Sequence, residues 1–272
     1  MKNREYTAKG IELVRKLAQE GYRVFTGEDA QKFGSDVGLS KNYLNQALFH
    51  LVHSGWLVRL HKGLYGLSSS MPGVSPLHEF EIAMSLVKPA AISHWSALHY
   101  HGLTEQIPRC VFVLTTNVVN APRTLVKKSD ADYFVGGMGY RFIKVKPERY
   151  FGTQKIWVGD ARVVITDPER TLLDGLMKPQ YCGDFSEALH AFQVYLPKLD
   201  IEKIISYALK LDTATAKRLG WVLEYMGVDF SRLEQLSVLP INSQIIWHRF
   251  EVTPNYWIDQ AQSLMTHLLH LQ

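Results

Sequence analysis

Amide and basic side chains gather in the segment 40–66, SKNYLNQALFHLVHSGWLVRLHKGLYG. Asn and Gln can form paired hydrogen bonds with adenine in the DNA major groove, whereas Lys contacts guanine or phosphate. Basic side chains on a neighbouring hairpin would reach the DNA backbone or the minor groove. The sequence therefore offers a set of candidate DNA-binding residues, which are Lys41, Asn42, Asn45, Gln46, His50, Arg59, His61 and Lys62.

This set requires a helix that leads directly into a β-hairpin. Ser40 is a suitable N-cap, because its hydroxyl can accept a hydrogen bond from a free N–H of the first turn, and Gly55 ends the helix. The apolar residues that recur at helical spacing, and so predict the buried face, are Tyr43, Leu44, Ala47, Leu48, Leu51 and Val52. Strand-like runs at 56–60 and 64–67 flank His61-Lys62-Gly63, a turn in which Gly suits a positive φ.

The residues before Ser40 supply the remaining parts of a winged helix-turn-helix. Residues 7–20 predict a first helix, and Val24-Phe25 predict a short strand. Thr26 and Asp29 fit a capping box at the start of a second helix over 27–33. In this fold the third helix enters the major groove. Winged helices also serve as protein-docking modules, so that alternative stays open.

The net charge of +4 lies entirely within residues 1–66, which contain ten Lys/Arg and six Asp/Glu, whereas residues 67–272 contain twenty of each. A local basic surface attracts a polyanion, and counterion release makes the binding salt-dependent. No apolar run approaches the ~18 residues of a membrane span, and the N-terminus does not resemble a signal peptide. Cys110 and Cys182 lie far apart without a CxxC motif. We therefore expect a cytoplasmic protein without a membrane partner, a disulfide framework or a zinc knuckle.

Ser, Gly and Pro in SSSMPGVSP predict a linker over 69–76. The expected organisation is a winged helix-turn-helix DNA-binding domain over 1–68, the linker, and a C-terminal α+β domain over 77–272. The C-terminal domain begins with helices at 77–88 and 94–101. The predicted strands, which form a small antiparallel or mixed sheet, are 90–92, 110–115, 124–126, 140–145, 153–158 and 162–165. Helical spacing follows from 184 to 237, then a strand-like tail at 241–258 and a short helix at 263–272.

Two clusters of side chains suggest other chemistry. His94, His99 and His101 suggest a metal site, but His94 and His99 are five residues apart and do not match the i, i+4 pairs of zinc-binding helices. The carboxylates that suggest a metal-dependent nuclease are Asp160, Asp167, Glu169 and Asp174. Glu169 is followed by Arg170-Thr171 and not by the Glu-x-Lys of restriction-type nucleases. Structural roles are favoured: Asp167 as a helix cap, and Arg170 with Asp174 as an i, i+4 pair. We expect no catalytic residue, no metal and no cofactor.

Three stretches together resemble the AbiEi-type antitoxins, transcriptional regulators of bacterial abortive-infection loci. They are GWLVRLHKGLYGL in the winged helix, AAISHWSALHYHGLTEQIP leading into CVFVLT, and VVITDPERTLLDGL. They occur in the family's order and, with the rest of the winged helix, span residues from about 7 to 177. The combination is more specific than any one stretch.

The resemblance implies a winged helix that binds inverted repeats in its own promoter and represses the operon, with DNA contact on the helix 41–50 and the wing 59–62. It implies a C-terminal antitoxin domain that counteracts a nucleotidyltransferase toxin encoded beside it, in a type IV system where direct contact between the two proteins is not required. It assigns no catalytic residue.

Two other hypotheses stay open. In the first, the protein is an enzyme that modifies nucleic acid or protein and is targeted to DNA by its winged helix. Its candidate residues would be the histidine cluster with Asp167, Glu169 and Asp174. In the second, it is a docking protein that binds through its aromatic tail.

Overall fold

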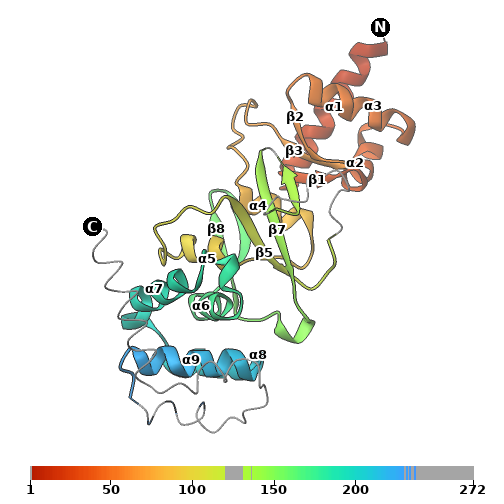
Figure 1. Ribbon diagram of the computed structural model, residues 1–272. Helices are drawn as coiled ribbons and strands as arrows, with labels where there is room; N and C mark the ends of the chain where they lie inside the picture. The colour runs from red at the N-terminus through yellow and green to blue at the C-terminus, as the bar shows by residue number, and fades with distance from the viewer. Residues whose placement is uncertain are drawn as a thin grey trace. The chain divides into compact units, whose positions relative to one another are not determined.

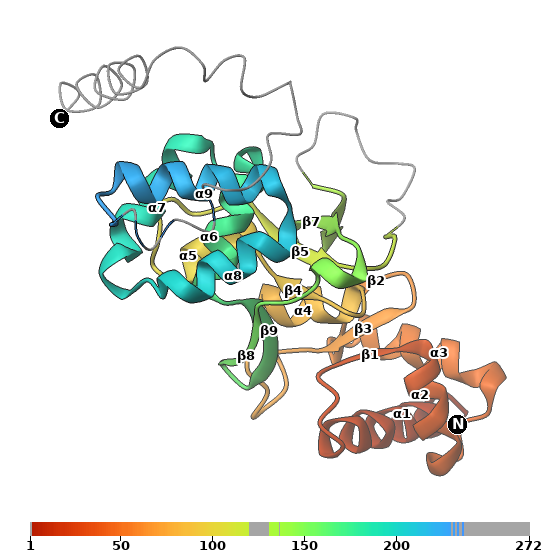
Figure 2. The ribbon, with the colours of Figure 1, turned by 90° about the horizontal axis from the view of Figure 1, so that it is seen from below.

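The computed structural model describes residues 2–119, 131–135 and 137–229, together with residues 231, 233 and 236. The chain divides into two compact units, residues 1–210 and 211–272. The first unit contains a three-stranded sheet with helices, followed by a six-stranded mixed sheet with further helices (Figures 1 and 2). This arrangement confirms the predicted α+β class.

The first part of the chain forms a winged helix-turn-helix. Its elements are α1 (Lys2–Gln19), β1 (Val24–Thr26), α2 (Gly27–Gly34), the 3-10 turn η1 (Ser35–Val37), α3 (Lys41–His53), β2 (Leu57–His61) and β3 (Leu64–Leu67). The strands pair antiparallel in the order β1-β3-β2. Only the start of α1 differs clearly from the prediction, since it begins at Lys2 and not near residue 7.

The two predicted caps of this module have different outcomes. The capping box of α2 is confirmed: Thr26 Oγ1 accepts from the Asp29 N–H at 3.1 Å, and the Asp29 carboxylate accepts from the Thr26 N–H at 2.8 Å. Ser40 occupies the N-cap position of α3, but its hydroxyl makes no capping hydrogen bond. The Tyr43 N–H, which such a cap would use, donates instead to the main-chain oxygen of Ser40 at 3.0 Å.

The buried face of α3 is narrower than the sequence pattern predicts. Leu44, Ala47, Leu48 and Leu51 are buried in a core with side chains of α1, α2 and β1. Tyr43 was expected on this face, but it is 45% exposed because it lies at the edge of the buried stripe.

Both faces of the three-stranded sheet are covered. Leu57 and Leu67 pack in the winged-helix core, whereas Leu60 and Leu64 belong to a second core that contains Phe80 from the following helix. A β-bulge between Arg59 and His61 shifts the register of β2 against β3.

The expected linker is bound by side chains from both flanking segments. Arg23, which directly precedes β1, donates to the main-chain oxygens of Ser75 and Pro76 at 3.0 and 3.1 Å. The same guanidinium lies 3.2 Å from Asp160 Oδ2 and 3.4 Å from Glu81 Oε1. The division into 1–68, 69–76 and 77–272 stays a prediction, because the winged helix and the next segment share packing and hydrogen bonds.

A mixed sheet forms the centre of the next segment. The elements are α4 (Glu79–Leu86), β4 (Ala91–Ile92), α5 (His94–Tyr100), β5 (Cys110–Thr115), β6 (Tyr133–Val135), β7 (Met138–Lys144), η2 (Pro147–Arg149), β8 (Thr153–Val158) and β9 (Ala161–Thr166). The strand order is β6-β7-β5-β4-β9-β8, in which β5 runs parallel to β7, and β4 parallel to β9. The strand predicted at 124–126 lies outside the described residues. Helix α4 is shorter than expected, because His78 caps it by accepting from the Phe80 N–H and the backbone is extended again at Val87.

The alternation along β5 shows how this sheet is covered. Val111 and Val113 pack in the core that includes Phe80 of α4, while Phe112 and Leu114 pack in another with Trp95. Figures 1 and 2 show α4 on one side of the sheet and α5 with α6 (Pro168–Met177) on the other.

The predictions at α6 are confirmed. Asp167 caps the helix by accepting from the Arg170 N–H, and Arg170 Nε donates to Asp174 Oδ1 at 2.9 Å. Both side chains of this pair are fully buried. The unit continues with η3 (Pro179–Tyr181), α7 (Phe185–Tyr195), η4 (Leu196–Lys198) and α8 (Ile201–Leu211).

The second unit contains α9 (Thr213–Tyr225), which begins where Asp212 accepts from the Thr215 N–H. The strand-like tail at 241–258 and the last helix at 263–272 lie outside the described residues, as does most of 231–239. Among the helices that the structure describes, none has the length and apolar character to cross a membrane.

Candidate nucleic-acid interface

The exposed face of α3 carries the predicted base-reading residues. Seven residues make nearly two helical turns, so Asn42 and Phe49 lie in line, with Asn45 and Gln46 on either side of that line. This line is opposite the buried stripe. All five candidates on the helix are exposed: Lys41, Asn42, Asn45, Gln46 and His50.

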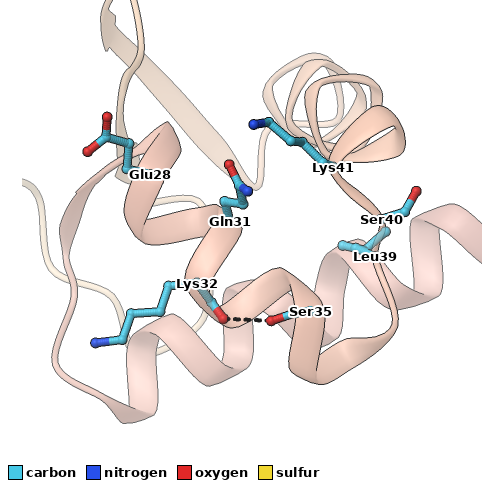
Figure 3. A pocket seen from close by; sticks show the side chains of 7 residues that line it. All are labelled: Glu28, Gln31, Lys32, Ser35, Leu39, Ser40 and Lys41. Atoms are coloured by element: carbon cyan, nitrogen blue, oxygen red, sulfur yellow. Dashed lines mark hydrogen bonds between the residues drawn. The ribbon is translucent and has the colours of Figure 1, made fainter.

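An open groove of about 660 Å³ separates α2 from the start of α3. In Figure 3, Gln31 of α2 and Lys41 of α3 project toward the same space, whereas Lys32 points away from Lys41. The residues that line it are Glu28, Gln31, Lys32, Ser35, Leu39, Ser40 and Lys41. Ammonium, amide and hydroxyl donors are the groups that bind phosphate oxygens, and in a helix-turn-helix the helix before the reading helix crosses the DNA backbone. The groove thus combines such donors from Gln31, Lys41 and Ser35 with the carboxylate of Glu28.

The wing is a short hairpin closed by Lys62-Gly63. Gly63 has a φ of +77°, as the turn requires, and its carbonyl accepts from the Gly27 N–H at 3.0 Å, which ties the wing tip to the start of α2. Arg59 and Lys62 are exposed, as a phosphate contact needs. His61 is half-buried, with its ring centroid 5.2 Å from that of Tyr133, so it contacts the second sheet. DNA contact by His61 stays a prediction.

Sequence reasoning gave no role to three side chains at this surface. Gln31 and Lys32 line the groove from α2, and Phe49 is 58% exposed on α3. The position of Phe49 on the exposed face could have been predicted, because it lies four residues after Asn45. The lining of the groove by Gln31 and Lys32 could not be predicted from the sequence, because it depends on how α2 and α3 pack.

Of the carboxylates considered for catalysis, Asp167 and Glu169 hold α6 and α8 together, whereas Asp174 pairs with Arg170 within α6. Lys203 Nζ lies 3.1 Å from Asp167 Oδ2 and 2.7 Å from Glu169 Oε2. Burial lowers the pKa of Lys203, but the hydrogen bonds and negative charges of Glu169 and Asp167 outweigh this effect and raise it above its ordinary value. Tyr207 donates to Asp167 Oδ2 at 3.1 Å. Asp160, the remaining candidate carboxylate, contacts Arg23.

The three histidines of residues 94–101 lie in different environments. His94 is fully buried, its Nδ1 lies 2.9 Å from Ser93 Oγ, and burial lowers its pKa to about 4. His101 Nε2 lies 2.8 Å from the main-chain oxygen of Thr166, and burial lowers its pKa too, whereas His99 is exposed. Within the described parts of the chain, no three His, Cys, Asp or Glu side chains are grouped so that they could hold a metal ion. Cys110 and Cys182 are both buried and form no disulfide with each other.

Comparisons with known proteins agree with this architecture. The crystal structure of the RV2827C protein from Mycobacterium tuberculosis superposes with a TM-score of 0.57 at 16% sequence identity, covering 84% of this chain and 80% of that one. At this identity the likeness concerns the fold alone. No protein of curated function matches the chain significantly. The family described as "Transcriptional regulator, AbiEi antitoxin" matches residues 12–68. The resemblance predicted from the sequence is thus confirmed over the winged helix, which is similar to this family over residues 12–68.

Proposed function

We propose that the protein is a DNA-binding autorepressor and the antitoxin of an AbiE-like phage-defence system. The observation that carries this proposal is the exposed face of α3, where Asn42, Asn45 and Gln46 lie opposite the core of a winged helix that matches a family of transcriptional regulators. The clustering of the net positive charge within residues 1–66 supports a polyanionic partner.

In this proposal α3 lies in the major groove of double-stranded DNA at inverted repeats in the protein's own promoter. Asn45 and Gln46 contact base edges, and Lys41 with Gln31 of α2 binds phosphates beside the groove. Arg59 and Lys62 add phosphate contacts from the wing. Occupation of the promoter by the protein then excludes the polymerase.

The antitoxin function rests on the family match and concerns a nucleotidyltransferase toxin. We propose that the protein acts on this toxin without catalysis of its own. Asp167, Glu169 and Asp174, the carboxylates that an enzymatic alternative would use, are buried in ion pairs with Lys203 and Arg170.

The proposal is tested in cells with two readouts from the full chain. One strain carries a reporter behind the DNA upstream of the gene, and another expresses the neighbouring gene. With the protein supplied from an independent promoter, the wild type should repress the reporter and restore growth. The double variant Asn45→Ala/Gln46→Ala should lose repression and still restore growth. Full repression by the double variant would contradict base reading, and toxicity unaffected by the wild type would contradict the antitoxin function.

The absence of catalysis has its own test. Purified protein is analysed for metals and titrated with Mg²⁺, Mn²⁺ and Zn²⁺ by calorimetry. We expect no stoichiometric binding. A site filled at one metal per chain, and lost in Asp167→Asn or His94→Asn, would instead support the enzymatic alternative.

A further inference from the structure

We propose that Phe49 is a specificity-determining residue that reads the C5-methyl group of a thymine in the major groove. The inference rests on the proposed DNA-binding function and extends it to a residue that polar-contact reasoning overlooks.

The position of Phe49 is the first argument. Single exposed hydrophobic residues are common and need no explanation on their own. Phe49, however, is 58% exposed at the centre of the α3 face, two turns after Asn42 and one turn after Asn45. Its side chain therefore points in the direction of the amides that are proposed to read bases.

The second argument is that the ring is held in place. The His53 ring lies 4.0 Å from the Phe49 ring, centroid to centroid, with 35° between their planes, and the His50 ring packs edge-on at 5.8 Å. His53 is itself fixed, because its Nδ1 lies 3.1 Å from the main-chain oxygen of Phe49. A ring that is held in this way loses little conformational freedom on binding, which favours its use as a contact.

The third argument is chemical. In the major groove only thymine presents a methyl group, and apolar side chains including Phe recognise it by contact. One helical turn advances about 5.4 Å and one base pair about 3.4 Å, which puts the thymine within roughly two base pairs of the bases read by Asn45 and Gln46. An apolar protein partner would be surrounded here by Asn, Gln and Lys side chains, and the excess positive charge of residues 1–66 favours DNA over such a partner.

The experiment uses the full chain and the tightest-binding duplex recovered from a random-sequence pool. Each thymine of that duplex is replaced in turn by deoxyuridine, which removes the methyl group and keeps the base pairing. For the wild type, one replacement per half-site should weaken binding about fourfold, which is the effect of losing one buried methyl group. Phe49→Ala should bind the thymine duplex more weakly than the wild type and show no difference between thymine and deoxyuridine at that position. If Phe49 contacts the methyl group directly, the effects of Phe49→Ala and of the deoxyuridine replacement on the binding free energy should not be additive.

Trp157→Ala is the matched control, because Trp157 is an aromatic residue 68% exposed on β8 and distant in sequence from α3. This variant should retain the wild-type sensitivity to deoxyuridine, and circular dichroism should show that both variants fold.

Three results would overturn the proposal while leaving the DNA-binding function intact. Specific binding by the wild type that is indifferent to every deoxyuridine replacement would do so. So would equal sensitivity to deoxyuridine in Phe49→Ala. If Phe49→Ala instead abolished self-association measured by sedimentation and left DNA binding unchanged, Phe49 would belong to a protein interface. Failure of the wild type to enrich any duplex would refute the DNA-binding function itself.

Discussion

Asn45 and Gln46 lie on the face of α3 opposite the core, where a base edge can replace water as the hydrogen-bond partner. We predict that Asn45→Ala and Gln46→Ala each weaken binding to the specific site by ~1–3 kcal/mol, because each variant lacks a paired hydrogen bond to a base. Titrations of specific and unrelated duplexes by fluorescence anisotropy measure the effect. Gln193→Ala on α7, another exposed amide, is the control and should have no effect. Equal weakening on both duplexes would refute base reading by these residues.

In contrast to Asn45 and Gln46, the basic residues around the groove and on the wing should contribute to binding without sequence preference. Replacement of Lys41, Arg59 or Lys62 by Gln should weaken binding to all duplexes alike, because a phosphate then keeps its counterion. Each replacement should lower the slope of log K against log salt by about 1. Affinities measured at five salt concentrations give this slope. An unchanged slope for all three variants would mean that these side chains do not bind phosphates.

His94 makes the stability of the fold depend on pH. Because burial depresses its pKa from 6.5 to about 4, its contribution to stability is complete above pH 6.5 and is lost as the pH falls toward 4. At about 1.4 kcal/mol per pKa unit, the loss is roughly 3 kcal/mol. His94 has a φ of +50°, so Asn, which tolerates this conformation, is the replacement of choice.

Urea unfolding of the wild type and of His94→Asn at pH 7.5 and 4.5 tests this effect. The variant should be the less pH-sensitive of the two. A wild type and variant that lose the same stability over this range would show that His94 does not titrate as proposed.

Residue-level features were predictable where the partners are close in sequence. The Thr26–Asp29 capping box, the Asp167 cap and the Arg170–Asp174 pair each join residues three or four positions apart, and all three are present. The burial of the Arg170–Asp174 pair and the exposure of Tyr43 depend on distant packing, and the sequence pattern carried no signal for them.

At the scale of elements, the wing hairpin has two roles. Its strands carry Arg59 and its turn carries Lys62, while Leu60 and Leu64 pack with Phe80 in the core of the next segment. The hairpin was predictable from its alternation and from Gly63, but its covered second face was not, because a strand pattern does not identify its partner.

The close packing of the hairpin predicts a modest loss of stability when Gly66 is replaced. A Cβ at this position would overlap Leu77 Cδ1 and lie 3.3 Å from Leu60 Cδ1. Both atoms are the ends of leucine side chains, which can shift, so we expect Gly66→Ala to lower the free energy of unfolding by about 1 kcal/mol, the lower end of the range for overpacked sites. Gly27→Ala is the control, since an added Cβ there meets nothing within 4 Å. Chemical denaturation of both variants measures the difference, and equal stabilities would contradict the packing of Leu77 on β3.

At the scale of the whole molecule, the order of the modules and the α+β class followed from periodicity and turn residues alone. The separation of a basic N-terminal part from a neutral remainder was likewise visible in the sequence. The contacts between these two parts could not be predicted from the sequence. Arg23 bonds to Ser75, Pro76 and Asp160, residues 52 to 137 positions away, and a composition rich in Ser, Gly and Pro predicted a free linker where the structure has a bound one.

The central claim is that this chain reads a specific DNA sequence through α3 and the wing. A footprint of the full-length protein on the DNA upstream of its own gene, repeated at low and near-physiological salt, tests it most directly. The account predicts protection of an inverted repeat at both salt concentrations, with affinity that falls steeply as salt rises. Protection without sequence preference, or none at all at low salt, would contradict it and would assign the winged helix to docking with another protein.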